Sequence, residues 1–166
     1  MVFDTDSIAL SYENVATAKQ WWMNAFDCKA VPVPPDWDDP LPSDVALKFP
    51  RNDEPAILLS DRTEVEQAGL DRSSPVVSVI FCNKLKKAYE HLSSRGILVG
   101  PIQDGGDTQF FEIRDTEGNL FQICKESRLA ECRSLARRSA TLGQALGFTC
   151  GRLGMTAMEG TAFRRD

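Results

Sequence analysis

The spacing of hydrophobic and polar residues along the first part of the chain changes several times between the period of a strand and that of a helix. Residues 7–12 alternate small polar with apolar side chains, as a half-buried strand does, and residues 14–26 then carry apolar side chains at helical spacing. A proline-rich stretch over 31–42 predicts an edge strand that runs into a loop, because proline cannot donate to a ladder. Residues 44–49 and 55–60 predict two further strands, which gives the order βαβββ.

The second part of the chain repeats this order. Residues 75–82 predict a strand and residues 83–96 a helix, and three more strands are predicted over 97–102, 108–114 and 120–126. The two halves superpose at an offset of about 70 residues, which indicates one supersecondary unit used twice. We therefore expect an α+β fold with two βαβββ modules.

Both predicted helices have an expected N-cap and an apolar stripe. Asn14 and Asn83 stand at the N-cap positions, and Gly96 lies just past the end of the second helix. The side chains that share the two stripes are Val15, Ala18, Trp22 and Phe26 in the first helix, and Leu85, Ala88, Tyr89 and Leu92 in the second.

The stretch "FFEIRDTEGNLFQI", residues 110–123, together with the repeated order of elements, resembles the vicinal oxygen chelate superfamily. That superfamily includes glyoxalase I, extradiol dioxygenases, fosfomycin-resistance enzymes and bleomycin-resistance proteins. The resemblance covers residues 5–126; Thr116 and Glu117 replace the usual Pro and Asp of its turn, and both suit a turn. It implies a cupped mixed sheet made of two modules, at about residues 5–62 and 75–126, whose concave face binds ligands.

Side chains alternate across a strand, so parity assigns them to the helix-packed face or to the cavity. In the last strand Phe121 and Ile123 take the helix-packed face, which turns Gln122 into the cavity. The other side chains expected to line the cavity are Ser7, Ala9, Ser11, Val77, Val79, Phe81, Phe110, Glu112, Arg114, Leu120 and Cys124. The residues predicted to bind the ligand, in the cavity or at its rim, are Ser7, Ser11, Trp37, Lys48, Leu58, Val77, Phe81, Phe110, Glu112 and Gln122.

The resemblance also gives the positions of the metal ligands in metal-dependent relatives. These positions fall on Ser7, Leu58, Val77 and Gln122 in this chain, and only the Gln122 amide is able to ligate. A divalent ion needs three or four well-placed N, O or S ligands. We therefore expect no metal and no cofactor, and we interpret Gln122 as a hydrogen-bonding residue of the pocket.

Glu112 is the one acid predicted inside the cavity. Burial beside Phe110 and Phe81 favours a raised pKa and a role as general base. The alternative is that Glu112 pairs with Arg114 or Lys48 at the rim, and the sequence leaves both open. The sole histidine, on the outer helix, is predicted to be a solvated residue.

Trp37 lies in the segment "PPDWDDP", among Asp36, Asp38 and Asp39. An aromatic ring surrounded by acids suits a flat, positively charged ligand, through stacking and cation–π contact. The alternative is an anchor that fixes the loop to the domain surface.

Charge is distributed unevenly along the chain, whose net charge is −5. Residues 1–126 carry 12 Lys and Arg against 21 Asp and Glu, a net of −9, whereas residues 127–166 carry 7 Arg against 3 acids, a net of +4. An acidic body argues against nucleic acid as a partner. No apolar run is long enough to span a membrane and no signal peptide is recognisable, so we expect a cytoplasmic protein without membrane contact.

The five cysteines are scattered without a C-x-x-C pair, which predicts free thiols. Residues 128–148 carry an apolar stripe opposite several arginines, so we expect residues 127–166 to form an Arg-rich helical tail that follows the 1–126 domain. Because its charge is opposite to that of the body, we expect the tail to dock there and to contribute to a homodimer.

Two functions of different classes remain open at this point. The first is a metal-independent protein that binds and sequesters a cationic aromatic drug-like molecule. The second is a lyase, isomerase or dioxygenase of glyoxalase type that uses a displaced metal site or Glu112 as base.

Overall fold

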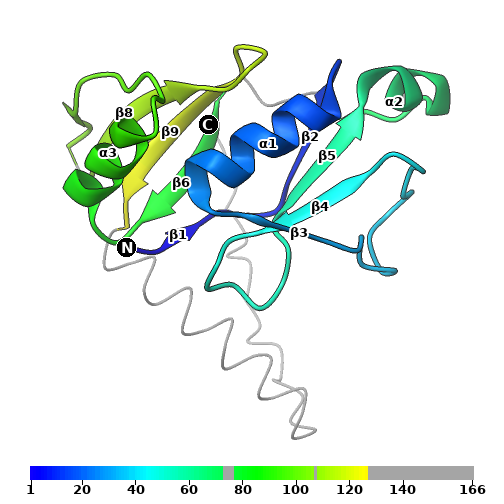
Figure 1. Ribbon diagram of the computed structural model, residues 1–166, viewed down its shortest axis with the longest axis horizontal. Helices are drawn as coiled ribbons and strands as arrows, with labels where there is room; N and C mark the ends of the chain where they lie inside the picture. Colours follow the sequence, from blue (N-terminus) through cyan, green and yellow to red (C-terminus); the bar gives the residue numbers. More distant parts are fainter. Residues whose placement is uncertain (73–76, 107, 127–166) are drawn as a thin grey trace, which may run out of the picture. The chain divides into compact units, whose positions relative to one another are not determined.

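The structure is a computed structural model, and it describes residues 1–72, 77–106 and 108–126 (Figure 1). The N-terminal module has a four-stranded sheet of order β2-β5-β4-β3. Its elements are β2 (Ile8–Tyr12), α1 (Val15–Phe26), β3 (Lys29–Val31), β4 (Val45–Lys48) and β5 (Ile57–Asp61). None of the helices in the described ranges is long and apolar enough to cross a membrane.

The C-terminal module has a five-stranded sheet of order β1-β6-β9-β8-β7. Its elements are β6 (Ser78–Cys82), α3 (Leu85–Ser94), β7 (Gln103–Asp104), β8 (Gln109–Arg114) and β9 (Leu120–Lys125), with β1 (Phe3–Asp4) added at the edge of β6. In each module the first and last strands pair in parallel and the other pairs are antiparallel. The predicted α+β fold with two mixed βαβββ sheets is therefore confirmed.

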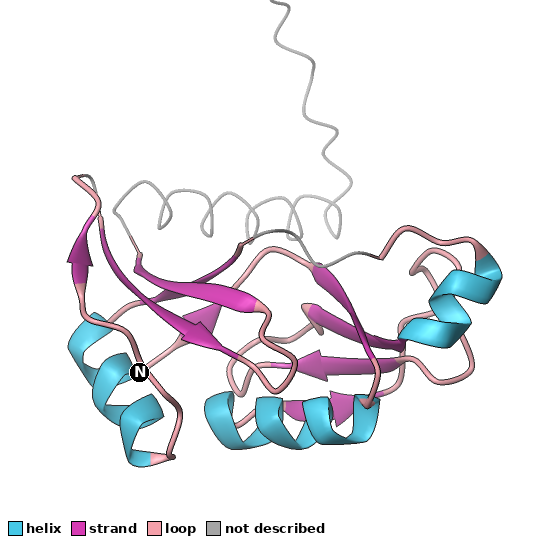
Figure 2. Ribbon diagram, turned by 90° about the horizontal axis from the view of Figure 1, so that it is seen from above, coloured by secondary structure: helices cyan, strands magenta, loops and turns pink. Residues whose placement is uncertain are grey.

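Helices α1 and α3 cover one side of the strands. Figure 2 shows α1 and α3 on the same side, and α1 lies between the two sheets in Figure 1. Trp22 of α1 is fully buried, and its ring meets the ring of Phe121 in β9 edge-on at 5.2 Å. The core thus runs through both modules along α1, and in the described ranges neither α1 nor α3 covers the opposite face of the sheets.

The first helix follows its predicted pattern. The Asn14 side chain accepts a hydrogen bond from the Thr17 backbone N–H at 2.9 Å, which is an N-cap contact. Ala18, Trp22 and Phe26 are buried as the stripe predicted.

The second helix differs at its start. Its N-cap residue is Lys84, without a side-chain cap bond, so the prediction for Asn83 was wrong. The Asn83 side chain instead accepts a hydrogen bond from the Val2 backbone at 3.1 Å, which ties the N-terminal segment to the second module. Gly96 follows the helix at φ 76°, as expected for the residue just past a helix end.

Several other elements differ from the prediction. Strand β3 precedes the prolines, which form loop, and of 97–102 only Val99 forms a bridge, to Ile113. Strand β1 and helix α2 (Arg62–Ala68) were not predicted. The signal for α2 was present, because the Asp61 carboxylate caps the helix by accepting from the backbones of Thr63 and Glu64.

The prediction of a helix over 128–148 and of a docked tail over 127–166 concerns residues outside the described part of the chain.

Candidate functional site

The face of the second sheet that turns away from the helices follows the predicted parity. Phe111 and Ile113 of β8 are buried, and so are Phe121 and Ile123 of β9. The alternate side chains lie on the opposite face, which we call the C-terminal face. Its members are Val79, Phe81, Phe110, Glu112, Arg114, Leu120, Gln122 and Cys124.

Glu112 and Gln122 form the polar centre of the C-terminal face. They are direct cross-strand partners in the β8–β9 register, and Gln122 Nε2 donates a hydrogen bond to Glu112 Oε1 at 3.2 Å. Both side chains are half-buried. The neutral amide in the last strand therefore holds the acid at the centre of this face in position; a second acid, Asp4 of β1, lies at its edge as the cross-strand partner of Phe81.

An aromatic row lies beside this polar pair. Cys124 is the cross-strand partner of Phe81 on one side and of Phe110 on the other, so the thiol lies between two phenyl rings. It is 7% exposed, and burial raises its pKa above the ordinary value. The face is thus apolar at one end and polar at its centre.

The rim pairing considered for Glu112 does not occur. Among the described residues Glu112 has no ion pair with Arg114 or with Lys48. Lys48 lies in β4 of the other sheet, opposite Lys29. Whether Glu112 acts as a base stays a prediction.

A groove of about 750 Å³ borders the C-terminal face at the edge of β8. Glu112, Arg114 and Leu120 belong both to the C-terminal face and to the lining of the groove. Trp21 of α1 and Leu98 belong to the apolar part of the groove lining. Leu98 is 90% exposed. Leu98 falls in the strand predicted over 97–102, and neither Leu98 nor Trp21 was predicted as a site residue.

The corresponding face of the first sheet is occupied by the chain itself. Ser11 and Leu58, both predicted to line the cavity, lie on this N-terminal face, where Ser11 pairs in register with Ser60. The Arg72 guanidinium donates to Ser60 Oγ at 2.8 Å and to both carboxylate oxygens of Asp44, at 3.0 and 2.8 Å. The Asp44 side chain has no exposed area and that of Arg72 is 8% exposed.

Arg72 also holds the loop that contains Trp37. Its second terminal nitrogen donates to the backbone carbonyls of Asp38 and Asp39, and Asp44 accepts from the Leu41 backbone at 2.8 Å. Trp37 itself is half-buried. These contacts favour the interpretation of this loop as anchored to the N-terminal module, and a ligand contact of Trp37 stays a prediction.

The four positions inherited from metal-dependent relatives do not fit a metal. Ser7 is exposed just before β2, Leu58 is a buried aliphatic residue of β5, and Val77 precedes β6. The side chain of Gln122 is bonded to Glu112. In the described ranges no group of three or more His, Cys, Asp or Glu side chains is placed to hold an ion.

His91 is not the solvated residue that was predicted. It is half-buried between the helices, and its Nε2 lies 3.7 Å from Asp27 Oδ2. Asp27 also pairs with Arg95 at 2.8 Å. This cluster joins the C-terminal ends of α1 and α3 and lies away from the C-terminal face.

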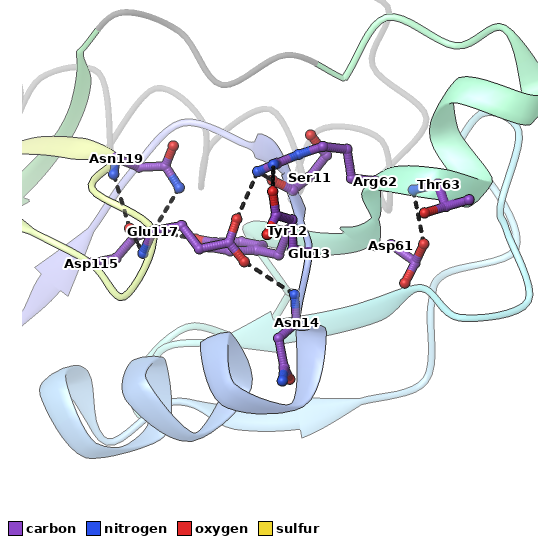
Figure 3. Close-up of polar contacts among 10 residues, drawn as sticks. All are labelled: Ser11, Tyr12, Glu13, Asn14, Asp61, Arg62, Thr63, Asp115, Glu117 and Asn119. Carbon is purple, nitrogen blue, oxygen red and sulfur yellow. Dashed lines mark hydrogen bonds and ion pairs between the residues drawn. The ribbon is translucent and has the colours of Figure 1, made fainter.

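The turn that led to the family resemblance joins the two modules (Figure 3). Tyr12 donates to Asp115 Oδ2 at 2.7 Å, and burial is the largest cause that raises the pKa of Tyr12, followed by the Asp115 charge. Glu117 pairs with Arg62 at 2.6 Å and accepts from the Asn14 backbone at 3.1 Å. Glu117, which replaces the Asp usual at this position of the turn, therefore binds residues of the first module.

Comparison with solved structures places this fold among proteins of several activities. The antibiotic-binding protein TnmS3 from Streptomyces sp. CB03234 is 12% identical, with 75% of this chain and 96% of that chain covered and a TM-score of 0.55. A lactoylglutathione lyase from Agrobacterium tumefaciens is 16% identical over 74% and 92% of the two chains, with a TM-score of 0.55. TioX from Micromonospora sp. ML1 is 16% identical over 75% and 97%, with a TM-score of 0.54.

These identities show a common fold and do not transfer an activity. No curated protein sequence matches the chain significantly. The family profile described as Glyoxalase/Bleomycin resistance protein/Dioxygenase superfamily matches residues 5–123. Together with the paired βαβββ modules, this match shows that the chain belongs to the glyoxalase/bleomycin-resistance/dioxygenase superfamily.

Proposed function

We propose that the protein is a metal-independent small-molecule-binding protein whose ligand is a cationic aromatic compound bound on the C-terminal face. The observation that carries the proposal is the Glu112–Gln122 pair, which lies next to the row of Phe81, Cys124 and Phe110. A half-buried carboxylate next to aromatic rings suits a flat cation. Antibiotic-like compounds are natural candidates, since a protein of the same fold, TnmS3, is an antibiotic-binding protein.

The energies involved are sufficient for useful affinity. A cation–π contact contributes about 0.5–2 kcal/mol, and a hydrogen bond to a charged group contributes about 1.5–3 kcal/mol. Burial of one aromatic ring adds roughly 25 cal/mol per Å² of apolar surface. These contributions together support micromolar binding after the cost of association.

The direct test is calorimetric titration of the full chain with a cationic aromatic amine and with its neutral analogue of the same shape. We expect the cation to bind more tightly, and Glu112→Gln to weaken the cation by about tenfold to a hundredfold while the neutral analogue changes little. Added salt should weaken the cation moderately. Glu54→Gln is a matched control, because it makes the same charge change at an exposed loop residue.

A different result identifies the alternative function. If anionic thioesters or glutathione conjugates bind and cationic aromatics do not, a lyase, isomerase or dioxygenase of glyoxalase type replaces this proposal.

Metal independence has its own test. Ser7, Leu58 and Val77 offer no ligand set, so we expect less than stoichiometric zinc, nickel, iron or manganese in the purified protein and an unchanged melting temperature after chelation. About one tightly bound ion per chain would contradict this part of the proposal.

We also propose that the protein is a homodimer, because closed two-fold dimers are the commonest oligomers. Light scattering should give twice the chain mass of 18.4 kDa. Removal of residues 127–166 should weaken the dimer, and a truncated chain that is equally dimeric would exclude a role of that segment.

A further inference from the structure

The C-terminal face changes its chemistry in three steps along its strands. The centre of the first row is aromatic, with Cys124 between Phe81 and Phe110, and Asp4 and Gln103 lie at its two ends. The second row contains Gln122 and Glu112. The third row contains Arg114, whose cross-strand partner is Leu120. Because residues on one face of a strand are two positions apart, successive rows lie about 7 Å apart.

The middle row presents two hydrogen-bond acceptors. A carboxylate has no hydrogen to donate, so the Gln122 amide turns its NH₂ group toward Glu112 and leaves its carbonyl oxygen free. Neither this oxygen nor Glu112 Oε2 has a hydrogen-bond partner among the described residues. Two acceptors on neighbouring strands are complementary to a group with at least two N–H donors, and a quaternary ammonium leaves both unsatisfied.

The third row presents a cation. Arg114 is exposed, and one of its nitrogens donates to the Gly118 carbonyl at 2.7 Å. Among the described residues Arg114 forms no ion pair and no side-chain hydrogen bond other than the one to Gly118. Four of the five N–H donors of its guanidinium therefore have no partner among these residues. A guanidinium in this state suits a carboxylate or another anionic group.

The groove beside the face connects the second and third rows. Glu112 and Arg114 both line it, and Trp21 and Leu98 supply apolar surface next to them. Its volume of about 750 Å³ falls within the range of small-molecule sites. A ligand that lies along β8 therefore has room to reach both charged side chains.

We infer, resting on the proposed function, that the ligand is zwitterionic: it carries an aromatic ring, a nitrogen cation with at least two N–H groups, and an anionic group about 7 Å from that cation. The ring lies on the Phe81–Phe110 row, the cation is bound by Glu112 and Gln122, and the anion is bound by Arg114. The preference for cations thus becomes a preference for a defined order of three groups along the strand.

Dipeptides provide suitable probes, because two extended residues separate an N-terminal ammonium from a C-terminal carboxylate by about 7 Å. The three probes are 2-naphthylalanyl-glycine, its C-terminal amide and the N,N,N-trimethyl form of the free acid. Each is titrated into the full chain by NMR, which also detects millimolar binding. We expect the amide and the trimethyl form each to bind about tenfold more weakly than the parent zwitterion.

The Arg114→Gln variant should bind the free acid and the amide equally, whereas Arg114→Lys should restore part of the difference. Arg51→Gln is the matched control, because it removes the same charge from another exposed arginine. Circular dichroism of each variant verifies that it folds, so that loss of discrimination is assigned to binding.

The outcomes separate this inference from the proposed function. Equal affinities for the three dipeptides, with Glu112→Gln still weakening all that carry a cation, would overturn the zwitterion and leave the cation-binding function intact. Binding of 2-naphthylmethylamine without binding of the zwitterionic dipeptide would do the same. If no cation binds at all, both proposals fail.

Discussion

The two modules share one topology but differ in the side chains on the sheet face opposite α1 and α3. In the N-terminal module this face holds the buried Arg72–Asp44–Ser60 network, in which every strong polar group has a partner from the same chain. In the C-terminal module it holds the half-buried Glu112–Gln122 pair, with acceptors that remain free among the described residues. The repeat thus contains two similar sheets, one of which carries an internally paired polar network, whereas the other carries the polar pair on which the proposed ligand site rests.

The largest expected effect on stability comes from removal of Arg72 from the network on the N-terminal face. Arg72→Ala leaves the Asp44 carboxylate buried without its cation, and we expect the free energy of unfolding to fall by about 3–5 kcal/mol in urea denaturation. Arg95→Ala is the control, because its partner Asp27 is 52% exposed, and it should cost about 1 kcal/mol or less.

The double variant Arg72→Met with Asp44→Leu tests whether the buried, unpaired charge causes this loss of stability. It removes both charges together, so it should recover much of the lost stability. Equal losses in Arg72→Ala and Arg95→Ala would contradict the difference between the two faces.

A smaller effect is expected at the junction of the modules. Tyr12→Phe removes the hydroxyl that donates to Asp115 and accepts from Trp22 Nε1 at 3.1 Å. The buried Trp22 N–H and the half-buried Asp115 carboxylate then each lose a partner, and we expect a loss of about 2 kcal/mol by denaturation. A loss below about 0.5 kcal/mol would show that the junction does not depend on this hydroxyl.

Buried thiols in both modules predict a loss of stability in alkali. Burial raises the pKa of Cys28 to about 12 and that of Cys82 to about 11, from an ordinary value of 9.0. Above pH 9 the unfolded thiols lose protons that the native thiols retain, so the free energy of unfolding falls as pH rises toward the native pKa values. The slope is about 1.4 kcal/mol per pH unit for each thiol.

Denaturation of Cys28→Ala and of Cys82→Ala between pH 8 and 11 checks this slope. Each variant should be less stable at pH 8 and should show a flatter decline than the parent protein. Parallel curves for variant and parent would refute the assignment to that thiol.

The smallest expected effect on stability concerns the C-terminal face. Glu112 is half-buried and bonded to a single amide, so Glu112→Gln should change the free energy of unfolding by only about 0.5 kcal/mol. The same variant should lower affinity for the cation strongly. A large loss of stability would instead make this pair resemble the Arg72 network.

The sequence was sufficient for the elements and faces that depend on local periodicity. The Asn14 cap, the buried stripe of α1 and the parity of β8 and β9 all follow from side-chain spacing within one element. Sequence order also placed Glu112 and Gln122 in adjacent strands, although their hydrogen bond required the register.

The remaining features depend on contacts between distant segments. Arg72 lies between the modules, and its partner Asp44 is 28 residues away, so no local pattern marks it. The loss of the Asn83 cap has the same cause, because the Val2 backbone engages its side chain instead. Short elements such as β1 and β7, two residues each, carry no usable period.

The Glu117 contacts have a consequence for how the chain can be divided. This one carboxylate pairs with Arg62 and accepts a hydrogen bond from the backbone of Asn14, the N-cap residue of α1, although it belongs to the second module. If the two modules were expressed as separate fragments, each would lack the contacts that Glu117 makes across the junction. We therefore expect the fragments to fold only when they associate with each other. The repeat therefore offers a place to split the protein into fragments whose reassembly reports on ligand binding, provided the fragments retain Tyr12, Arg62 and Glu117.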